Sequence, residues 1–161
     1  MKTLIVYYSR TGTTRKLAAA LANVLGADLS EIRCDRYGRG PFGYLCAGYD
    51  SVKGNLPPIG MPRERFLDYD LVLIGGPIWT SYPALPIRAL LAGKPELPAR
   101  VGLFLTYGGH SPPDKAVAEV AAALPQSIEA SLTLKSDDVG EARLAGEVNK
   151  FVKQLALDSS E

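Results

Sequence analysis

The chain has 161 residues, of which 47% are hydrophobic and 22% are charged. This length suits one domain with its own core, and charged residues interrupt every apolar run well before the roughly 18 residues of a membrane-spanning helix. Eighteen Lys and Arg residues stand against 17 Asp and Glu residues, a formal net charge of +1, so no overall field favours nucleic acid or an anionic membrane as a partner. We expect a single soluble globular domain over residues 1–161.

The two cysteines and the single histidine argue against several kinds of site. Cys34 and Cys46 lack the Cys-x-x-Cys spacing of a redox pair or zinc knuckle, and one histidine is too few for most metal sites. The apolar stretch that follows Met1 is too short for a signal peptide, and no small-residue cleavage site follows it. We therefore expect reduced thiols, no bound metal and a cytoplasmic location.

Strands and helices are predicted to alternate along the N-terminal two thirds of the chain. Residues 3–8 are rich in β-branched and aromatic side chains, which predicts a buried strand. The helical spacing of Leu17, Leu21 and Leu25 predicts a helix that ends at Gly26. The same reasoning then predicts a short strand over 28–33, a buried strand over 71–76, a helix over 82–91 and a buried strand over 101–106.

The C-terminal third continues this alternation. Residues 112–114 mark the start of a helix, and the acidic pair at 137–138 supplies negative charge to the N-terminus of a last one. Apolar and polar residues alternate over 128–134, which is typical of a half-exposed edge strand. The pattern predicts an α/β fold, a right-handed doubly wound sheet of five parallel strands with helices on both faces, whose ligands bind beyond the carboxyl ends of the strands.

Residues 38–62 interrupt the alternation with many glycines and prolines. Residues 44–52 within this segment are predicted to form a short helix. Long irregular connections are uncommon in compact domains and often functional. We therefore expect this segment to border a ligand site or a partner surface.

The loop after the first strand has the chemistry of a phosphate site. It offers four hydroxyls, a flexible glycine and a guanidinium at the start of a helix, whose unpaired N–H groups favour an anion. A plain turn with threonine caps is the alternative. The chain lacks both the Gly-Lys-Ser/Thr of a nucleotide triphosphate loop and the Gly-x-Gly-x-x-Gly of a dinucleotide site. The loop reads Ser9-Arg10-Thr11-Gly12-Thr13-Thr14.

Two further strand-end loops carry aromatic residues to the same edge of the predicted sheet. Residues 75–83 include Trp79, the single tryptophan of the chain, and residues 106–111 include Tyr107. Either ring alone could be an ordinary packing residue. Two aromatic walls beside a phosphate loop, with glycines that let backbone amides approach, predict a slot for a flat phosphorylated ligand.

Taken in order, the motifs Ser-x-Thr-Gly-x-Thr, Gly-x-Pro-Ile-Trp and Thr-x-Gly-Gly resemble the flavodoxin family over nearly the whole chain. The resemblance implies non-covalently bound FMN, and the uninterrupted strand at 128–134 resembles the short-chain branch. It implies that the phosphate is held by Ser9, Arg10, Thr11, Gly12, Thr13 and Thr14. It also implies that one side of the isoalloxazine ring meets Pro77, Ile78, Trp79 and Thr80, while its other side and pyrimidine edge meet Thr106, Tyr107, Gly108 and Gly109. His110 could hydrogen-bond the flavin or stay in solvent.

Two features depart from the electron carriers of that family. Such carriers are usually strongly acidic, whereas this chain has a net charge of +1. They also often place a glycine after the tryptophan position, where a carbonyl can turn toward the one-electron-reduced flavin. Here Thr80 and Ser81 follow Trp79, and a positive φ without glycine costs roughly 1 kcal/mol or more. Both features lean away from a specialised carrier.

Three functions remain open on this reading. The first is an FMN-bound electron carrier in which the flavin alone performs the redox chemistry and no side chain is catalytic. The alternative is an FMN-dependent NAD(P)H:quinone-type oxidoreductase, in which Tyr37, Phe42, Tyr44 and Tyr49 flank a flat acceptor. The third is a flavin-free interaction domain. The expected partners are redox proteins or a small flat acceptor such as a quinone, and the apolar pattern favours neither monomer nor dimer.

Overall fold

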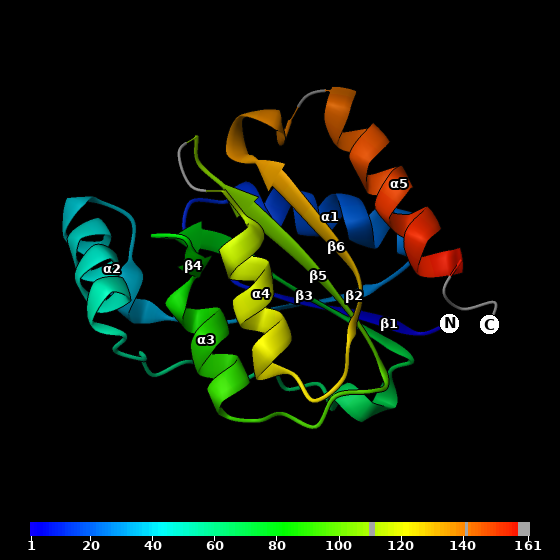
Figure 1. Ribbon diagram of the computed structural model, residues 1–161, viewed down its shortest axis with the longest axis horizontal. Helices are drawn as coiled ribbons and strands as arrows, with labels where there is room; N and C mark the ends of the chain where they lie inside the picture. The colour runs from blue at the N-terminus through cyan, green and yellow to red at the C-terminus, as the bar shows by residue number, and fades with distance from the viewer. Residues whose placement is uncertain (110–111, 141, 158–161) are drawn as a thin grey trace.

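The computed structural model describes residues 1–109, 112–140 and 142–157. Its centre is a sheet in the order β2-β1-β3-β5-β6, and each neighbouring pair is parallel (Figure 1). A short strand, β4, pairs antiparallel with the end of β3. The strands are β1 (Thr3–Tyr7), β2 (Asp28–Glu31), β3 (Leu71–Trp79), β4 (Tyr82–Pro83), β5 (Arg100–Tyr107) and β6 (Ile128–Lys135). The predicted doubly wound sheet of five parallel strands is confirmed.

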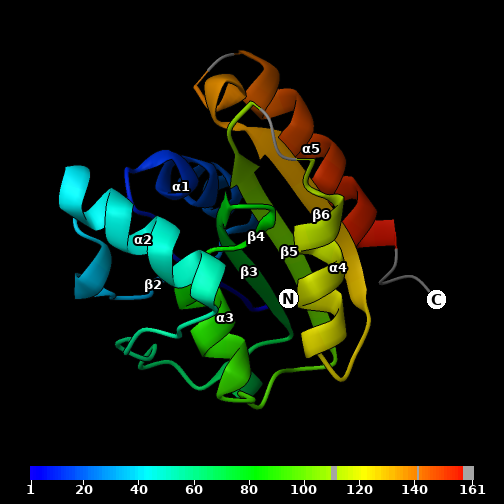
Figure 2. The same cartoon turned by 60° about the vertical axis from the view of Figure 1, so that its left-hand side comes forward.

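Helices cover both faces of this sheet. In Figure 2, α3 and α4 lie in front of the strands, and α1 and α5 lie behind them. α2 stands apart at the left edge of Figure 1. The helices are α1 (Thr13–Leu25), α2 (Pro41–Lys53), α3 (Leu85–Ala92), α4 (Asp114–Ala123) and α5 (Ala142–Leu157), with one-turn 3₁₀ helices at Asp35–Tyr37, Phe66–Asp68 and Ser136–Asp138. None of the described helices combines the length and apolar character needed to cross a membrane.

The core is divided into two layers by the sheet itself. Successive side chains of a strand point to opposite faces, so Ile5 of β1 packs with Leu17 of α1 and Phe151 of α5. Its neighbour Leu4 packs on the other side with Ile87 of α3. Burial on both faces explains why the central strands are almost continuously apolar.

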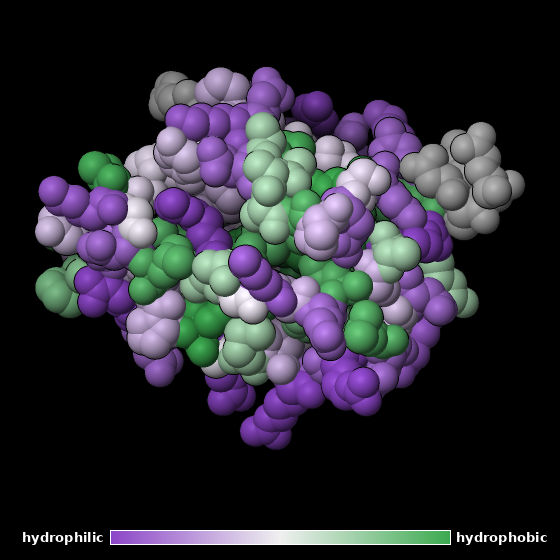
Figure 3. Space-filling view, turned by 60° about the horizontal axis from the view of Figure 1, so that its bottom comes forward, coloured by the Kyte–Doolittle hydropathy of each residue, from purple (hydrophilic) through white to green (hydrophobic). Residues whose placement is uncertain are grey.

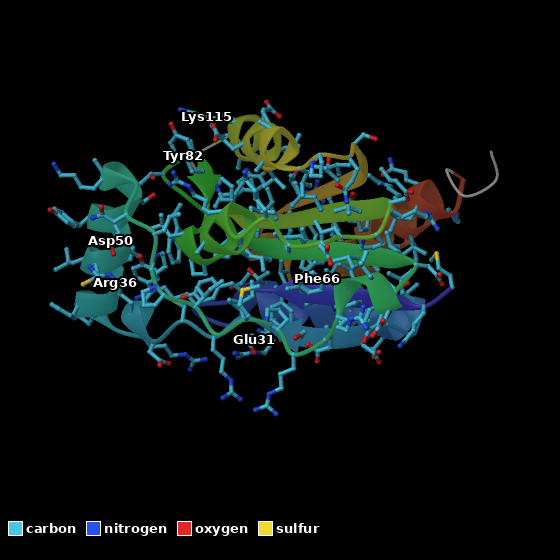
Figure 4. The ribbon with its side chains drawn as sticks, turned by 90° about the horizontal axis from the view of Figure 1, so that it is seen from below. Glu31, Arg36, Asp50, Phe66, Tyr82 and Lys115 are labelled. Atoms are coloured by element: carbon cyan, nitrogen blue, oxygen red, sulfur yellow. The ribbon has the colours of Figure 1, made fainter. Side chains whose placement is uncertain are left out.

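The predicted helix over 82–91 begins three residues later, at Leu85. Tyr82–Pro83 forms β4 instead, and the two-residue connection Thr80–Ser81 closes a hairpin with the end of β3. Lys115 of α4 makes a cation–π contact with this hairpin, with its Nζ 4.3 Å from the centre of the Tyr82 ring (Figure 4). Residues 82–83 thus pair with β3, although the sequence pattern over 82–91 predicts a helix.

Other boundaries differ by smaller amounts. The strand predicted over 28–33 ends at Glu31, and β3 runs on to Trp79. The acidic pair at 137–138 lies in the 3₁₀ turn Ser136–Asp138, ahead of α5. The predicted helix at 44–52 is confirmed and is longer, as α2. The edge position of β6 is also confirmed.

α2 packs through Gly43 against the segment that leads into it. A Cβ at this position would overlap the carbonyl oxygen of Gly38, so only glycine permits the contact. Gly75 has the corresponding role in β3, where a Cβ would overlap the Phe104 ring. Both glycines allow close packing near the carboxyl ends of the strands.

Candidate functional site

One pocket of about 390 Å³ opens beyond the carboxyl ends of β1, β3 and β5. This volume falls within the range of small-molecule and cofactor sites. All three strand-end loops that the sequence singles out reach it. The lining residues are Ser9, Arg10, Thr11, Thr13 and Thr14 from the first loop, Pro77, Ile78, Trp79 and Thr80 from the second, and Thr106 and Gly108 from the third.

Four predicted site residues are placed differently. Gly12 does not line the pocket, but its φ of 101° makes the turn into α1. Tyr107 is half-buried and packs against the apolar cluster below α3 and α4. Gly109 is exposed away from the pocket lining. His110 lies outside the described residues.

Four lining residues come from outside these loops. α2 contributes Tyr44, Ala47 and Gly48, and the 3₁₀ turn after β6 contributes Ser136. The sequence indicates that residues 38–62 border a ligand site, and Tyr44 is among the aromatic residues expected there. Neither periodicity nor a motif points to Ala47, Gly48 or Ser136.

The first loop is held in shape by its own hydroxyls. Ser9 Oγ accepts a hydrogen bond from the Gly12 amide at 3.1 Å. The buried hydroxyls of Thr14 and Thr106 lie 2.8 Å apart, which ties this loop to the end of β5. No side chain among the described residues caps α1. Its first N–H groups and the positive end of its dipole therefore remain available to an anion.

Arg10 connects the first loop to the segment that leads into α2. Its guanidinium donates to the carbonyl of Gly40 at 2.9 Å and, more weakly, to that of Gly38 at 3.4 Å. It also lies over the Tyr44 ring, 5.7 Å from the ring centre. Its Nε is buried and has no hydrogen-bond partner among the described residues. A buried cationic donor beside an uncapped helix N-terminus fits a phosphate.

Trp79 is clamped by two tyrosines. The Tyr8 and Tyr37 rings meet it edge-on, with ring centres 5.8 Å and 5.2 Å away. The loss of hydration on burial is the largest cause that raises the pKa of both tyrosines, so both phenols stay neutral. Because Trp79 also lines the pocket, the clamp gives the pocket a rigid aromatic wall.

Asp50 anchors α2 beside that wall. Its buried carboxylate accepts hydrogen bonds from Arg36 Nε at 2.5 Å, Tyr37 Oη at 2.9 Å and Asn55 Nδ2 at 3.3 Å (Figure 4). These bonds, led by that of the Arg36 guanidinium, lower the pKa of Asp50 to about 2. Since Tyr37 contacts both Asp50 and Trp79, the carboxylate fixes helix and pocket wall together.

A second hollow, of about 480 Å³, lies on the other side of Arg10, beyond the ends of β1 and β2. It is more open, and most of its exposed lining is polar, with Arg33, Arg39 and Glu31 at its walls. The first pocket is mainly apolar and holds the Trp79 wall. Apolar walls with a few placed polar groups are typical of ligand sites, so we take the first pocket as the candidate site.

Comparison with known proteins assigns the fold. No family model matches the chain, and no curated protein is significantly similar to it. A flavoprotein from Lactobacillus acidophilus NCFM, solved in complex with FMN, is 24% identical, with a TM-score of 0.67 over 94% of this chain and 98% of that one. Flavodoxin 2 from Bacillus cereus is 15% identical, with a TM-score of 0.66 over 98% and 99%. This chain has the flavodoxin-like fold.

A flavodoxin from the domain Archaea extends the likeness over the full length of both chains, with 16% identity and a TM-score of 0.56. The predicted resemblance to the flavodoxin family is therefore confirmed at the level of the fold. In this flavodoxin-like chain the first loop, Trp79 and Thr106 lie at the carboxyl edge of the sheet. Ligands of open α/β sheets bind at this edge, where the strand order reverses between β1 and β3.

Proposed function

We propose that this chain binds FMN non-covalently in the strand-end pocket and acts as a redox protein through the flavin. The observation that carries the proposal is that an uncapped helix N-terminus and a clamped tryptophan open on the same pocket. The helix N-terminus suits a phosphate, and the tryptophan suits a flat aromatic ring. FMN contains both groups.

The residues present fit each part of FMN. The phosphate is assigned to the backbone N–H groups at the start of α1, to the Thr13 hydroxyl and to the buried Nε of Arg10. The isoalloxazine ring is assigned to Trp79 on one side, and Tyr44 of α2 also lines the pocket. When bound, the flavin supplies the electron-transfer chemistry, and the protein binds and orients it.

We further propose electron transfer between redox partners as the function of the bound flavin. Among the described residues that line the pocket there is no carboxylate, lysine or histidine to act as an acid or base. A lining of hydroxyls, aromatic rings and one arginine leaves the redox step to the cofactor. We accordingly assign no catalytic side chain.

The second candidate is an FMN-dependent NAD(P)H:quinone-type oxidoreductase, with a flat acceptor as substrate. Tyr44 favours it, because this residue lines the pocket while its side chain remains 69% exposed. The other aromatic residues predicted to flank an acceptor lie elsewhere. Tyr37 is buried behind Trp79, and Phe42 and Tyr49 point to solvent.

The test of flavin binding is calorimetric titration of the apoprotein with FMN and, separately, with riboflavin, which lacks the phosphate. We expect one FMN per chain and riboflavin weaker by at least about tenfold, since that ratio corresponds to one strong charge-assisted contact. If neither ligand binds, the remaining function is that of a flavin-free interaction domain.

A matched pair of variants locates the phosphate. Thr13→Val, in the first loop, is expected to weaken FMN roughly two- to tenfold, the value of one hydrogen bond, and to leave riboflavin unchanged. Thr133→Val, on β6 outside the pocket, is expected to change neither. Equal effects of Thr13→Val on both ligands would contradict the phosphate assignment.

Carrier and reductase are separated by turnover. Steady-state assays with NADH and NADPH against several quinones compare the FMN-loaded protein with free FMN. Turnover no faster than that of free FMN supports the carrier, provided that the reduced protein passes electrons to a one-electron acceptor. Faster quinone turnover, lowered by Tyr44→Ala, favours the reductase.

A further inference from the structure

α2 buries one side and exposes large apolar side chains on the opposite side. Its inner side is buried and contains Gly43, Ala47, Asp50 and Ser51. Its outer side presents large apolar side chains at a spacing of three, four and three residues, which places them in one line along the helix. We call this line the outer stripe; it consists of Phe42, Leu45, Tyr49 and Val52.

The outer stripe is unusually exposed for its composition. Its four side chains are 78%, 67%, 61% and 78% exposed in chain order. Hydrophobic side chains reach the surface at the left end of Figure 3, the side on which α2 stands in Figure 1. Four large exposed apolar side chains on one side of a helix indicate an interaction surface.

The charges around the stripe help to identify what covers it. The one acidic residue of α2, Asp50, is buried and bonded to Arg36. The nearest free charges, Arg39 and Lys53, lie beyond the two ends of the stripe. The stripe itself therefore carries no charge that would select an acidic or basic partner. In a pair of identical stripes, only these basic residues at the two ends repel one another.

We propose that the outer stripe packs against the outer stripe of a second copy of this chain. The three-four-three spacing is that of the seam by which two helices bury one another. Such a pairing is self-complementary about a two-fold axis near the middle of α2, with the helices antiparallel. Leu45 then meets the partner's Tyr49, and Tyr49 meets the partner's Leu45.

The exposed area agrees with a weak dimer. A fully covered aromatic side chain buries about 150–250 Å² and an aliphatic one somewhat less, so the two aromatic and two aliphatic side chains, each partly exposed, offer roughly 500 Å² per copy. Two copies then bury roughly 1,000 Å², the lower limit for a specific interface. A dissociation constant on the order of micromolar is expected for a contact of this size. The dimer does not depend on whether the pocket holds a flavin.

Sedimentation velocity of the full chain from about 1 to about 200 µM, a range that spans a micromolar dissociation constant, tests the dimer. We expect a concentration-dependent shift from monomer to dimer. Leu45→Glu should remain monomeric throughout, because the charge enters the middle of the seam. The matched control is Leu67→Glu, which places the same charge at a half-exposed leucine far from α2 and should dimerise as the parent does.

A mixing experiment distinguishes a broken interface from a damaged helix. L45E and Y49K are each expected to be monomeric, and an equimolar mixture is expected to dimerise again, because position 45 of one copy faces position 49 of the other and opposite charges meet there. Circular dichroism verifies that both variants are folded. A monomeric parent, or L45E that still dimerises, would overturn the proposal. So would a monomeric parent that sediments with phosphatidylserine vesicles, which would assign the stripe to a membrane surface.

Discussion

The hydroxyls of Ser51 and Thr80 lie 2.6 Å apart, joining α2 to the turn that follows Trp79. Both central residues of that turn have positive φ, 51° for Thr80 and 70° for Ser81, as a two-residue hairpin of type I′ requires. Glycine and asparagine are the residues that tolerate this region best. The hairpin beside the pocket is therefore strained and is supported from α2.

Replacing Ser81 by glycine is expected to raise the free energy of unfolding by about 0.5–1 kcal/mol, because the positive φ then costs little. Thr80→Gly relieves the same strain but removes the hydrogen bond to Ser51, worth about 0.5–1.5 kcal/mol, so its net effect is near zero or destabilising. Urea unfolding followed by Trp79 fluorescence measures both.

Ser51→Ala provides the control for this pair. In the Ser51→Ala background the hydrogen bond is already lost, so Thr80→Gly is expected to stabilise as Ser81→Gly does. A Ser81→Gly variant that is less stable than the parent would contradict the positive φ at this residue.

Alanine substitutions at two glycines of α2 are expected to change the stability in opposite directions. Gly43→Ala places a methyl group against the Gly38 carbonyl, a backbone atom that cannot move aside, and is expected to cost about 1–3 kcal/mol. Gly48→Ala meets nothing within 4 Å and gains helix propensity, up to about 1 kcal/mol. Thermal unfolding measures the difference. Equal effects of the two substitutions would mean that Gly43 does not pack against the Gly38 carbonyl.

Much of the fold follows from the sequence, because the strands buried on both faces are almost continuously apolar. The range 3–8 predicts β1 to within one residue, and the alternation at 128–134 predicts an edge strand. β4 was not predictable in this way. A type I′ turn is recognised by glycine or asparagine, and Thr80-Ser81 gives no such signal, so the stretch from 82 onward was interpreted as helix.

The candidate site, too, could be predicted from the sequence only in part. Three loops converge because the carboxyl ends of parallel strands meet at one edge, which the order of motifs already indicates. The contribution of α2 depends instead on tertiary contacts, such as the hydrogen bond between Ser51 and Thr80. No local pattern encodes these contacts, so Ala47 and Gly48 were missed. Tyr107 likewise could not be separated from Trp79 by sequence, since both follow the strands as predicted, 71–76 and 101–106.

Asp50 is expected to make stability depend on acid pH. Its pKa in the folded protein is about 2, below the ordinary value of 3.8, so its contribution is present above pH 3.8 and is lost as the pH falls toward 2. Asp50→Asn should cost about 2–4 kcal/mol at pH 7, because Arg36 and Tyr37 lose a charged acceptor. The variant should also show a shallower loss of stability between pH 4 and pH 2.

The matched control for Asp50 is Asp35→Asn, which changes an exposed carboxylate in the neighbouring 3₁₀ turn. It is expected to leave the stability nearly unchanged. Trp79 emission provides a second readout, because Tyr37 touches both Asp50 and the indole. An unchanged emission in Asp50→Asn would show that the carboxylate supports α2 without positioning the pocket wall.

The buried pair of Thr14 and Thr106 predicts strong coupling between the first loop and β5. Thr14→Val or Thr106→Val alone leaves one buried hydroxyl without its partner, at a cost of about 1–3 kcal/mol. The double variant replaces both hydroxyls by methyl groups of similar shape, so it is expected to cost at least about 1 kcal/mol less than the sum of the single changes. Urea unfolding of the four proteins measures this coupling. Additive costs would mean that the two hydroxyls do not bond, and the loop would then owe its position to the Ser9–Gly12 hydrogen bond and to the contacts of Arg10.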